Sequence, residues 1–90
     1  MDKNKVNFKI KGSSNVHKCS LSLYKLISEG NDVEISAIGA AAVNQAVKIT
    51  VKARSMMAQG GRDLLIRPGM RNEIVEEKEL SLIVFNFIVA

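Results

Sequence analysis

The stretch from Val33 to Met57 changes its hydrophobic period at the middle, and this change constrains the fold more than any other feature of the chain. Apolar residues alternate from Val33 through Ile35 to Ala37, which is the period of a strand. After Gly39 they recur every three or four residues, as on a helix face: Val43, Ala46, Val47, Thr50, Val51 and Met57. We therefore predict a strand that turns directly into a long helix over about residues 40–58.

This long helix carries more apolar surface than one sheet covers. A second apolar row lies beside the first and consists of Ala42, Ala46, Ile49, Ala53 and Met56. A helix with such a wide apolar face needs a second partner, and in a chain with two helices we expect that partner to be another subunit. A different face carries polar donors and positive charge at helical spacing, on Asn44, Lys48, Lys52 and Ser55.

Two further elements precede this unit. Residues 5–11 alternate strictly, which predicts a half-buried strand with Lys9 and Lys11 on its outer face. Residues 16–29 show the stripe of an amphipathic helix, in which Cys19 lies on the apolar side. The turn residues between them supply a helix cap at Ser14 or Asn15.

The C-terminal third has the patterns of two strands. A strand begins at residues 63–66 and is interrupted at Pro68, so we expect it at an edge or bulged. The polar residues 70–79 form the arms and tip of a hairpin, and residues 80–89 form an apolar strand that is either central or covered by a partner. The order strand-helix-strand-helix-strand-strand predicts a single α/β domain over residues 1–90, a two-layer sandwich with a mixed four-stranded sheet and both helices on one face.

Composition limits the compartment and the partners. Thirteen Lys and Arg against nine Asp and Glu give a net charge of +4, which favours polyanions such as nucleic acid or an anionic membrane surface. The single cysteine permits no intrachain disulfide and indicates a reducing compartment. The first ten residues lack an apolar signal core, and residues 80–90 are too few to span a bilayer as a helix. We expect a cytoplasmic protein without membrane contact.

Catalysis and metal binding are not expected. Cys19 on an apolar stripe is best interpreted as a buried structural thiol, and His17 has no recognisable carboxylate partner. One Cys and one His make no metal-ligand cluster, so no metal or cofactor is predicted. The glycines fit no phosphate-loop or dinucleotide pattern. The acidic residues of the hairpin have the character of a solvated surface: Glu73, Glu76, Glu77 and Glu79. We therefore predict neither an enzyme nor a small-molecule substrate.

The basic residues are more informative. They come from both predicted helices, the first strand and the third, and if they converge they form a phosphate-binding surface; if they are scattered, they serve solubility. The few aromatic residues argue against base stacking as the main mode of binding.

Two short motifs in the right order resemble the stage V sporulation protein S family. The first is AIGxxAVNQAVK over residues 37–48, followed by Ala53-Arg54, and the second is DLxxxP over residues 63–68. The chain departs from the family pattern at His17-Lys18, at Ser55 and in its more apolar last strand. The resemblance implies an Alba-like fold and a homodimer that binds DNA or RNA in a regulatory role, with sporulation as the process in the family name.

Two functional hypotheses follow. In the first, the dimer binds the phosphate backbone of DNA or RNA through Lys9, Lys11, Lys18, Asn44, Gln45, Lys48, Lys52, Arg54, Arg67 and Arg71. In the second, the chain is a protein-protein interaction module in developmental regulation, and its apolar helix rows and last strand dock a protein partner without direct contact to nucleic acid.

Overall fold

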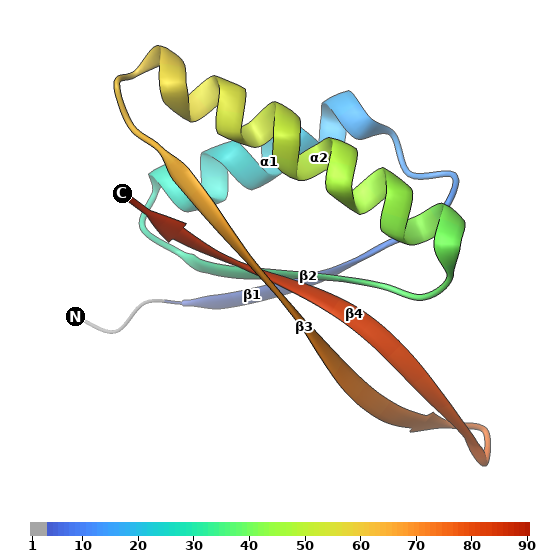
Figure 1. Ribbon diagram of the computed structural model, residues 1–90. Helices are drawn as coiled ribbons and strands as arrows, with labels where there is room; N and C mark the ends of the chain where they lie inside the picture. Colours follow the sequence, from blue (N-terminus) through green and yellow to red (C-terminus); the bar gives the residue numbers. More distant parts are fainter. Residues whose placement is uncertain (1–3) are drawn as a thin grey trace.

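The fold of residues 4–90, described by a computed structural model, is a two-layer α/β sandwich (Figure 1). Its elements follow the predicted order and are β1 (Lys5–Ile10), α1 (Val16–Ser28), β2 (Asp32–Ala37), α2 (Ala40–Gln59), β3 (Leu64–Val75) and β4 (Lys78–Val89). Both helices lie on one face of the sheet, as predicted (Figure 1). The predicted architecture is therefore confirmed.

The sheet is mixed and has the strand order β1-β2-β4-β3. β1 and β2 are parallel, whereas β4 is antiparallel to both of its neighbours. The apolar strand β4 is thus central, one of the two predicted possibilities. β3 lies at an edge, but the expected break at Pro68 is wrong, since Pro68 stays in register opposite Phe85. An edge strand tolerates proline because the N–H groups on its outer side make no hydrogen bonds to a neighbouring strand, so the N–H that proline lacks is not needed there.

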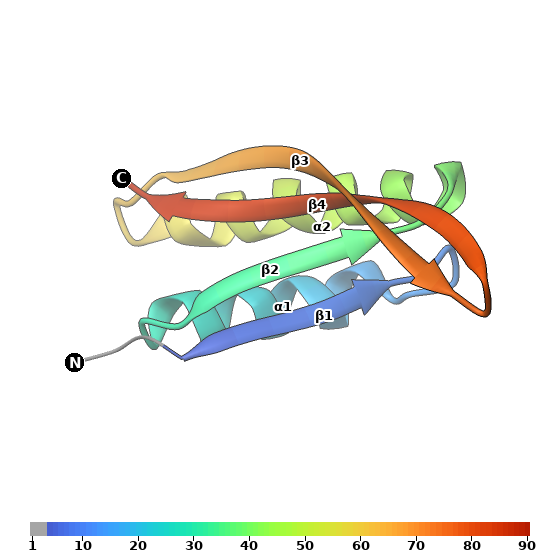
Figure 2. The ribbon, with the colours of Figure 1, turned by 90° about the horizontal axis from the view of Figure 1, so that it is seen from below.

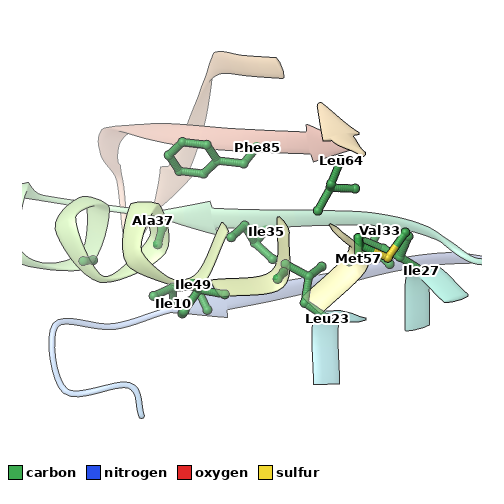
Figure 3. Close-up of a cluster of buried hydrophobic side chains, with 13 residues drawn as sticks. Ile10, Leu23, Ile27, Val33, Ile35, Ala37, Ile49, Met57, Leu64 and Phe85 are labelled. Atoms are coloured by element: carbon green, nitrogen blue, oxygen red, sulfur yellow. The ribbon is translucent and has the colours of Figure 1, made fainter. Parts of the chain in front are cut away.

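The main core lies between the helices and the sheet. Leu23 of α1, Ile49 and Met57 of α2, and Val33 and Ile35 of β2 are at most 2% exposed (Figure 3). The buried residues of α2 combine the two predicted rows, because Ala42, Ile49 and Ala53 of the second row are joined by Thr50 and Met57 of the first. Burial of these aliphatic side chains provides most of the driving force for folding. Cys19 is only half-buried at the rim of this core, which corrects the prediction of a buried thiol.

The β3–β4 hairpin continues beyond the helices and leaves the plane of the sheet on the side opposite to them (Figure 1). Seen from below, its arm passes the ends of β1 and β2 (Figure 2). The buried side chains of Leu82 and Val84 alternate with core residues of β4 and so belong to this outer face. An ion pair of 2.9 Å between Arg71 Nη1 and Glu34 Oε1 joins the arm to β2.

The loop from β1 to α1 packs against the start of α2. A Cβ atom added to Gly12 would lie 3.0 Å from the Cβ atom of Ala41, so a larger residue there would have to push the loop away from α2 by a few tenths of an ångström. The Gln45 side chain donates a hydrogen bond of 3.0 Å to the carbonyl oxygen of Ser14. These contacts hold the two strand-to-helix connections side by side, at the end of the sheet where both helices begin (Figure 1).

Candidate functional site

A pocket of about 480 Å³ opens where β1 and β2 end and α2 begins. We call it the α2 pocket. Its walls come from both strand ends, the turn at Gly39, the first turn of α2 and Leu82 of the hairpin. The space outside the carboxyl ends of parallel strands is where open α/β sheets bind ligands, because the helix N-termini converge there.

The N-terminus of α2 leaves backbone donors for a ligand. Its cap is Gly39, with φ of +87° and no side-chain hydrogen bond, so no side chain of the described chain caps the first turn. The first helical bond runs from the Val43 N–H to the Gly39 carbonyl oxygen, at 3.0 Å. The first turn is Ala40, Ala41 and Ala42, with no acidic residue. Its N–H groups and the helix dipole favour an anion at this position.

Two lysines add positive charge to the α2 pocket. Lys9, from the outer face of β1, and Lys11, from the loop that follows, both line it and are exposed. Within residues 4–90, neither ammonium group lies within 4.0 Å of a carboxylate. Their charges therefore act on a ligand without local neutralisation.

Ser36 lies in the wall of the same pocket and is 1% exposed. Its hydroxyl oxygen has no hydrogen-bond partner among the described residues. A buried hydroxyl without a partner costs about 1–3 kcal/mol, and a ligand oxygen that reached it would supply the missing hydrogen bond.

The start of α1 contributes a further predicted residue. Asn15 caps this helix through a hydrogen bond of 2.9 Å that its side-chain oxygen accepts from the backbone N–H of Lys18. The Lys18 side chain is exposed in the first turn. The first turn of α1 lies at the end of the molecule where α2 also begins (Figure 1).

The predicted residues of α2 divide into two groups. Asn44, Lys48 and Lys52 are exposed on its solvent side, as expected. Gln45 is half-buried and its amide is engaged with Ser14. In this conformation Gln45 supports the fold with one N–H of its amide, which holds the side chain against the β1–α1 loop.

Two predicted arginines are engaged in ion pairs. Arg54 Nε lies 2.8 Å from Asp63 Oδ1, which joins the two motifs of the family resemblance. The hydrogen bond from Arg54, together with the backbone N–H of Leu64, holds the pKa of Asp63 below its ordinary value. Asp63 in turn raises the pKa of Arg54 through the same hydrogen bond.

Arg71 binds Glu34 at 2.9 Å and approaches Glu73 at 3.6 Å. Arg67 is exposed on the edge strand, in register with Asn86. The predicted cationic set thus converges only in part: Lys9 and Lys11 share a pocket, whereas the arginines lie along β3 and on the flank of α2.

Sequence reasoning missed Ser36, Ile38 and Leu82, which complete the α2 pocket. Ser36 occupies one outward position in an alternating strand, and such a position is usually solvated. Its place just before a strand-to-helix turn was the available signal. For Leu82 the sequence held no signal, because its position depends on the path of the hairpin.

Neither a metal site nor a membrane span is found in the described part of the chain. No group of three or more His, Cys, Asp or Glu side chains is positioned to hold a metal ion in residues 4–90. Over the same residues, neither helix has the length and apolarity required to cross a membrane.

Comparison with solved structures places this architecture in the Alba-like class. The structure of Alba from Thermoplasma volcanium superposes with a TM-score of 0.58 at 15% sequence identity, covering 94% of this chain and 98% of that chain. At this identity the likeness establishes the fold. The family model of stage V sporulation protein S (SpoVS) matches residues 6–90, so the chain belongs to this family.

Proposed function

We propose that this protein is a regulator that acts in sporulation and binds the phosphate backbone of DNA or RNA as a homodimer. The observation that carries the proposal is a set of four lysines, three around the start of the two helices and one near the middle of α2: Lys9, Lys11, Lys18 and Lys48. All four are exposed, and within residues 4–90 none lies within 4.0 Å of a carboxylate. When such unpaired ammonium groups contact phosphates, counterions are released from the polyphosphate, and this release favours binding.

Membership of the SpoVS family and the likeness to Alba support this proposal. The mode of binding follows from the side chains available. Tyr24 and Phe8 are half-buried against the core, and Phe85 is buried within it, so these rings are poorly placed to stack on bases. Contacts with phosphates position a protein on nucleic acid without reading its sequence.

Homodimerisation is supported by exposed apolar side chains on α2 and on β3. Val47 and Val51 of α2 are 45% and 58% exposed. Met70 and Ile74 are 67% and 80% exposed. They lie an even number of residues after Leu64 in β3, so they share its side of the strand. A second copy of the chain that covered these residues would remove this apolar surface from water.

Binding to a fluorescent DNA duplex across a salt series tests the proposal. The logarithm of the affinity is expected to fall linearly with the logarithm of the salt concentration, and K48E/K52E is expected to weaken binding roughly tenfold or more at low salt. K25E/K78E is the control for this variant. It makes the same charge change on two other exposed lysines, one in the last turn of α1 and one beside the hairpin turn. An affinity that does not change with ionic strength would exclude binding through phosphate contacts.

The same exposed apolar residues also favour a second function, a protein-protein interaction module without contact to nucleic acid. In this case K48E/K52E leaves function unchanged, whereas V47D/V51D abolishes partner binding. Light scattering of the wild-type chain at high concentration distinguishes a homodimer from a monomer whose exposed apolar surface binds a different protein.

A further inference from the structure

We propose that the α2 pocket binds a small organic phosphomonoester of about nucleotide size. This inference goes beyond binding of the nucleic-acid backbone and does not depend on it. It adds a ligand with a terminal phosphate to a protein for which the sequence predicts no small-molecule substrate.

The size and walls of the α2 pocket define the body of this ligand. Its volume of about 480 Å³ lies within the range of about 300–1,000 Å³ that is usual for small-molecule sites. Ile38, Ala41 and Leu82 give much of the wall an apolar character. A single inorganic ion would leave this apolar surface uncovered, whereas a sugar or a base attached to the phosphate would cover it.

The first turn of α2 defines the charged head. Its backbone N–H groups have no capping side chain, and Ala40, Ala41 and Ala42 all line the α2 pocket. Lys9 and Lys11 line the same space. These groups together favour an anion that accepts several hydrogen bonds from different directions.

Ser36 supplies the independent observation that a helix terminus alone does not. Its hydroxyl is buried in the pocket wall without a partner among residues 4–90, although a buried hydroxyl normally has one. Its strand neighbours on the outer face show that this orphaned state is not general: Glu34 and Asn7 are joined by a hydrogen bond of 2.7 Å. A ligand oxygen would satisfy the Ser36 hydroxyl.

A phosphomonoester fits these donors better than a carboxylate does. It has three terminal oxygens in a tetrahedral arrangement and a charge of about −1.5 to −2 at pH 7. A carboxylate has two oxygens in one plane and a single charge. The helix terminus, the Ser36 hydroxyl and the two lysines are more donors than two oxygens in one plane can use, which favours the group with three oxygens and the larger charge.

Amide chemical shifts of the full ¹⁵N-labelled chain test the proposal, with adenosine 5′-monophosphate as the probe. We expect saturable shifts centred on Gly39, Ala40 and Ala41. Inorganic phosphate should shift the same amides at higher concentration, and adenosine should shift none of them. A DNA oligomer without a terminal phosphate distinguishes a phosphomonoester site from a part of the backbone-binding surface.

Two variants and one control complete the test. S36A removes the orphaned hydroxyl without leaving a new one and should weaken adenosine monophosphate binding roughly tenfold, as expected for a hydrogen bond to a charged group. K11Q should weaken it by a similar factor, and K25Q, in the last turn of α1, should not change it. S36A should leave the affinity for duplex DNA unchanged, which separates this proposal from nucleic-acid binding.

Three outcomes would overturn the proposal. The first is a set of shifts that is equally large with adenosine. The second is unchanged affinity for adenosine monophosphate in both S36A and K11Q. The third is that the unphosphorylated oligomer reproduces the same shifts more strongly than adenosine monophosphate, which would assign the α2 pocket to the nucleic-acid surface.

Discussion

The cationic side chains at the start of the helices and those along β3 have different neighbours. Lys9 and Lys11 line a pocket and meet no carboxylate within 4.0 Å in the described chain, whereas Arg71 is paired with Glu34 and Glu73. Arg54, which reaches the start of β3, is paired with Asp63. A count of positive residues therefore overstates the charge that is available to a ligand, because an ion pair already satisfies part of it.

The largest expected effect is on nucleic-acid binding, where unpaired lysines should contribute more affinity than paired arginines. K9Q/K11Q should reduce the salt slope of binding by about two and weaken low-salt affinity roughly tenfold or more, if both ammonium groups contact phosphates. R54Q/R71Q removes the same charge from paired residues and should cost less affinity and less slope. Fluorescence anisotropy with one DNA duplex measures both variants, and equal losses would show that ion pairing does not withhold the arginines.

The second prediction concerns the polar contact that joins the hairpin to the outer face of the sheet. Glu34 Oε1 accepts from Asn7 Nδ2 at 2.7 Å and pairs with Arg71 at 2.9 Å. E34Q weakens both interactions and should destabilise the protein by about 1 kcal/mol, discounted because Arg71 is 43% exposed. Urea denaturation measures this loss, and amide exchange should quicken in the hairpin arm.

Glu73 supplies the matched control for this prediction. It approaches Arg71 at 3.6 Å and is itself more exposed than Glu34. E73Q should change stability by less than about 0.5 kcal/mol, as is usual for a surface substitution. A larger loss in E73Q than in E34Q would place the important partner of Arg71 within the hairpin instead.

The third prediction compares two buried serines. Ser20 is fully buried and donates a hydrogen bond of 2.9 Å to the His17 carbonyl oxygen, whereas the equally buried Ser36 has no partner in the described chain. S20A should cost about 1 kcal/mol, and S36A should be neutral or stabilising. Thermal denaturation without ligand checks both variants, and a destabilised S36A would reveal a partner for its hydroxyl.

The smallest expected effect is the pH dependence at Asp63. Because its pKa is lowered in the folded state, Asp63 contributes stability above its unfolded pKa, and this contribution is lost as the pH falls through the folded value. D63N should therefore flatten the decline of stability below about pH 4. Denaturation measured from pH 7 to pH 2 checks this, with D32N as the control on an exposed carboxylate.

Much of the fold was predictable because its signals are local. Alternation in β1 and β2, helical spacing in α2 and the position of Pro68 on an edge strand each depend on residues a few positions apart. The predicted break in β3 is wrong, because the edge of the sheet tolerates Pro68 within a continuous strand. The half-burial of Cys19 was not predictable, because an apolar stripe on a helix shows which way a side chain points but not how deeply it is buried.

The candidate site was predictable only in part. The motif over residues 37–48 and the excess of lysine pointed to the start of α2 and to anions. The homodimer, the cytoplasmic location and the non-enzymatic role stay predictions. The pairing of Arg54 with Asp63, which connects the two motifs of the family resemblance, was not apparent from their sequence.

The sequence by itself determined the order of the elements, the apolar face of each and the family. Only the tertiary structure decided which charges are paired and which polar groups lack a partner. The physical reason is that hydrophobic period is set by near neighbours in the chain. Electrostatic partners depend instead on how distant strands meet, as when Arg71 of the hairpin reaches Glu34 of β2 and when Ser36 is buried beside the start of α2.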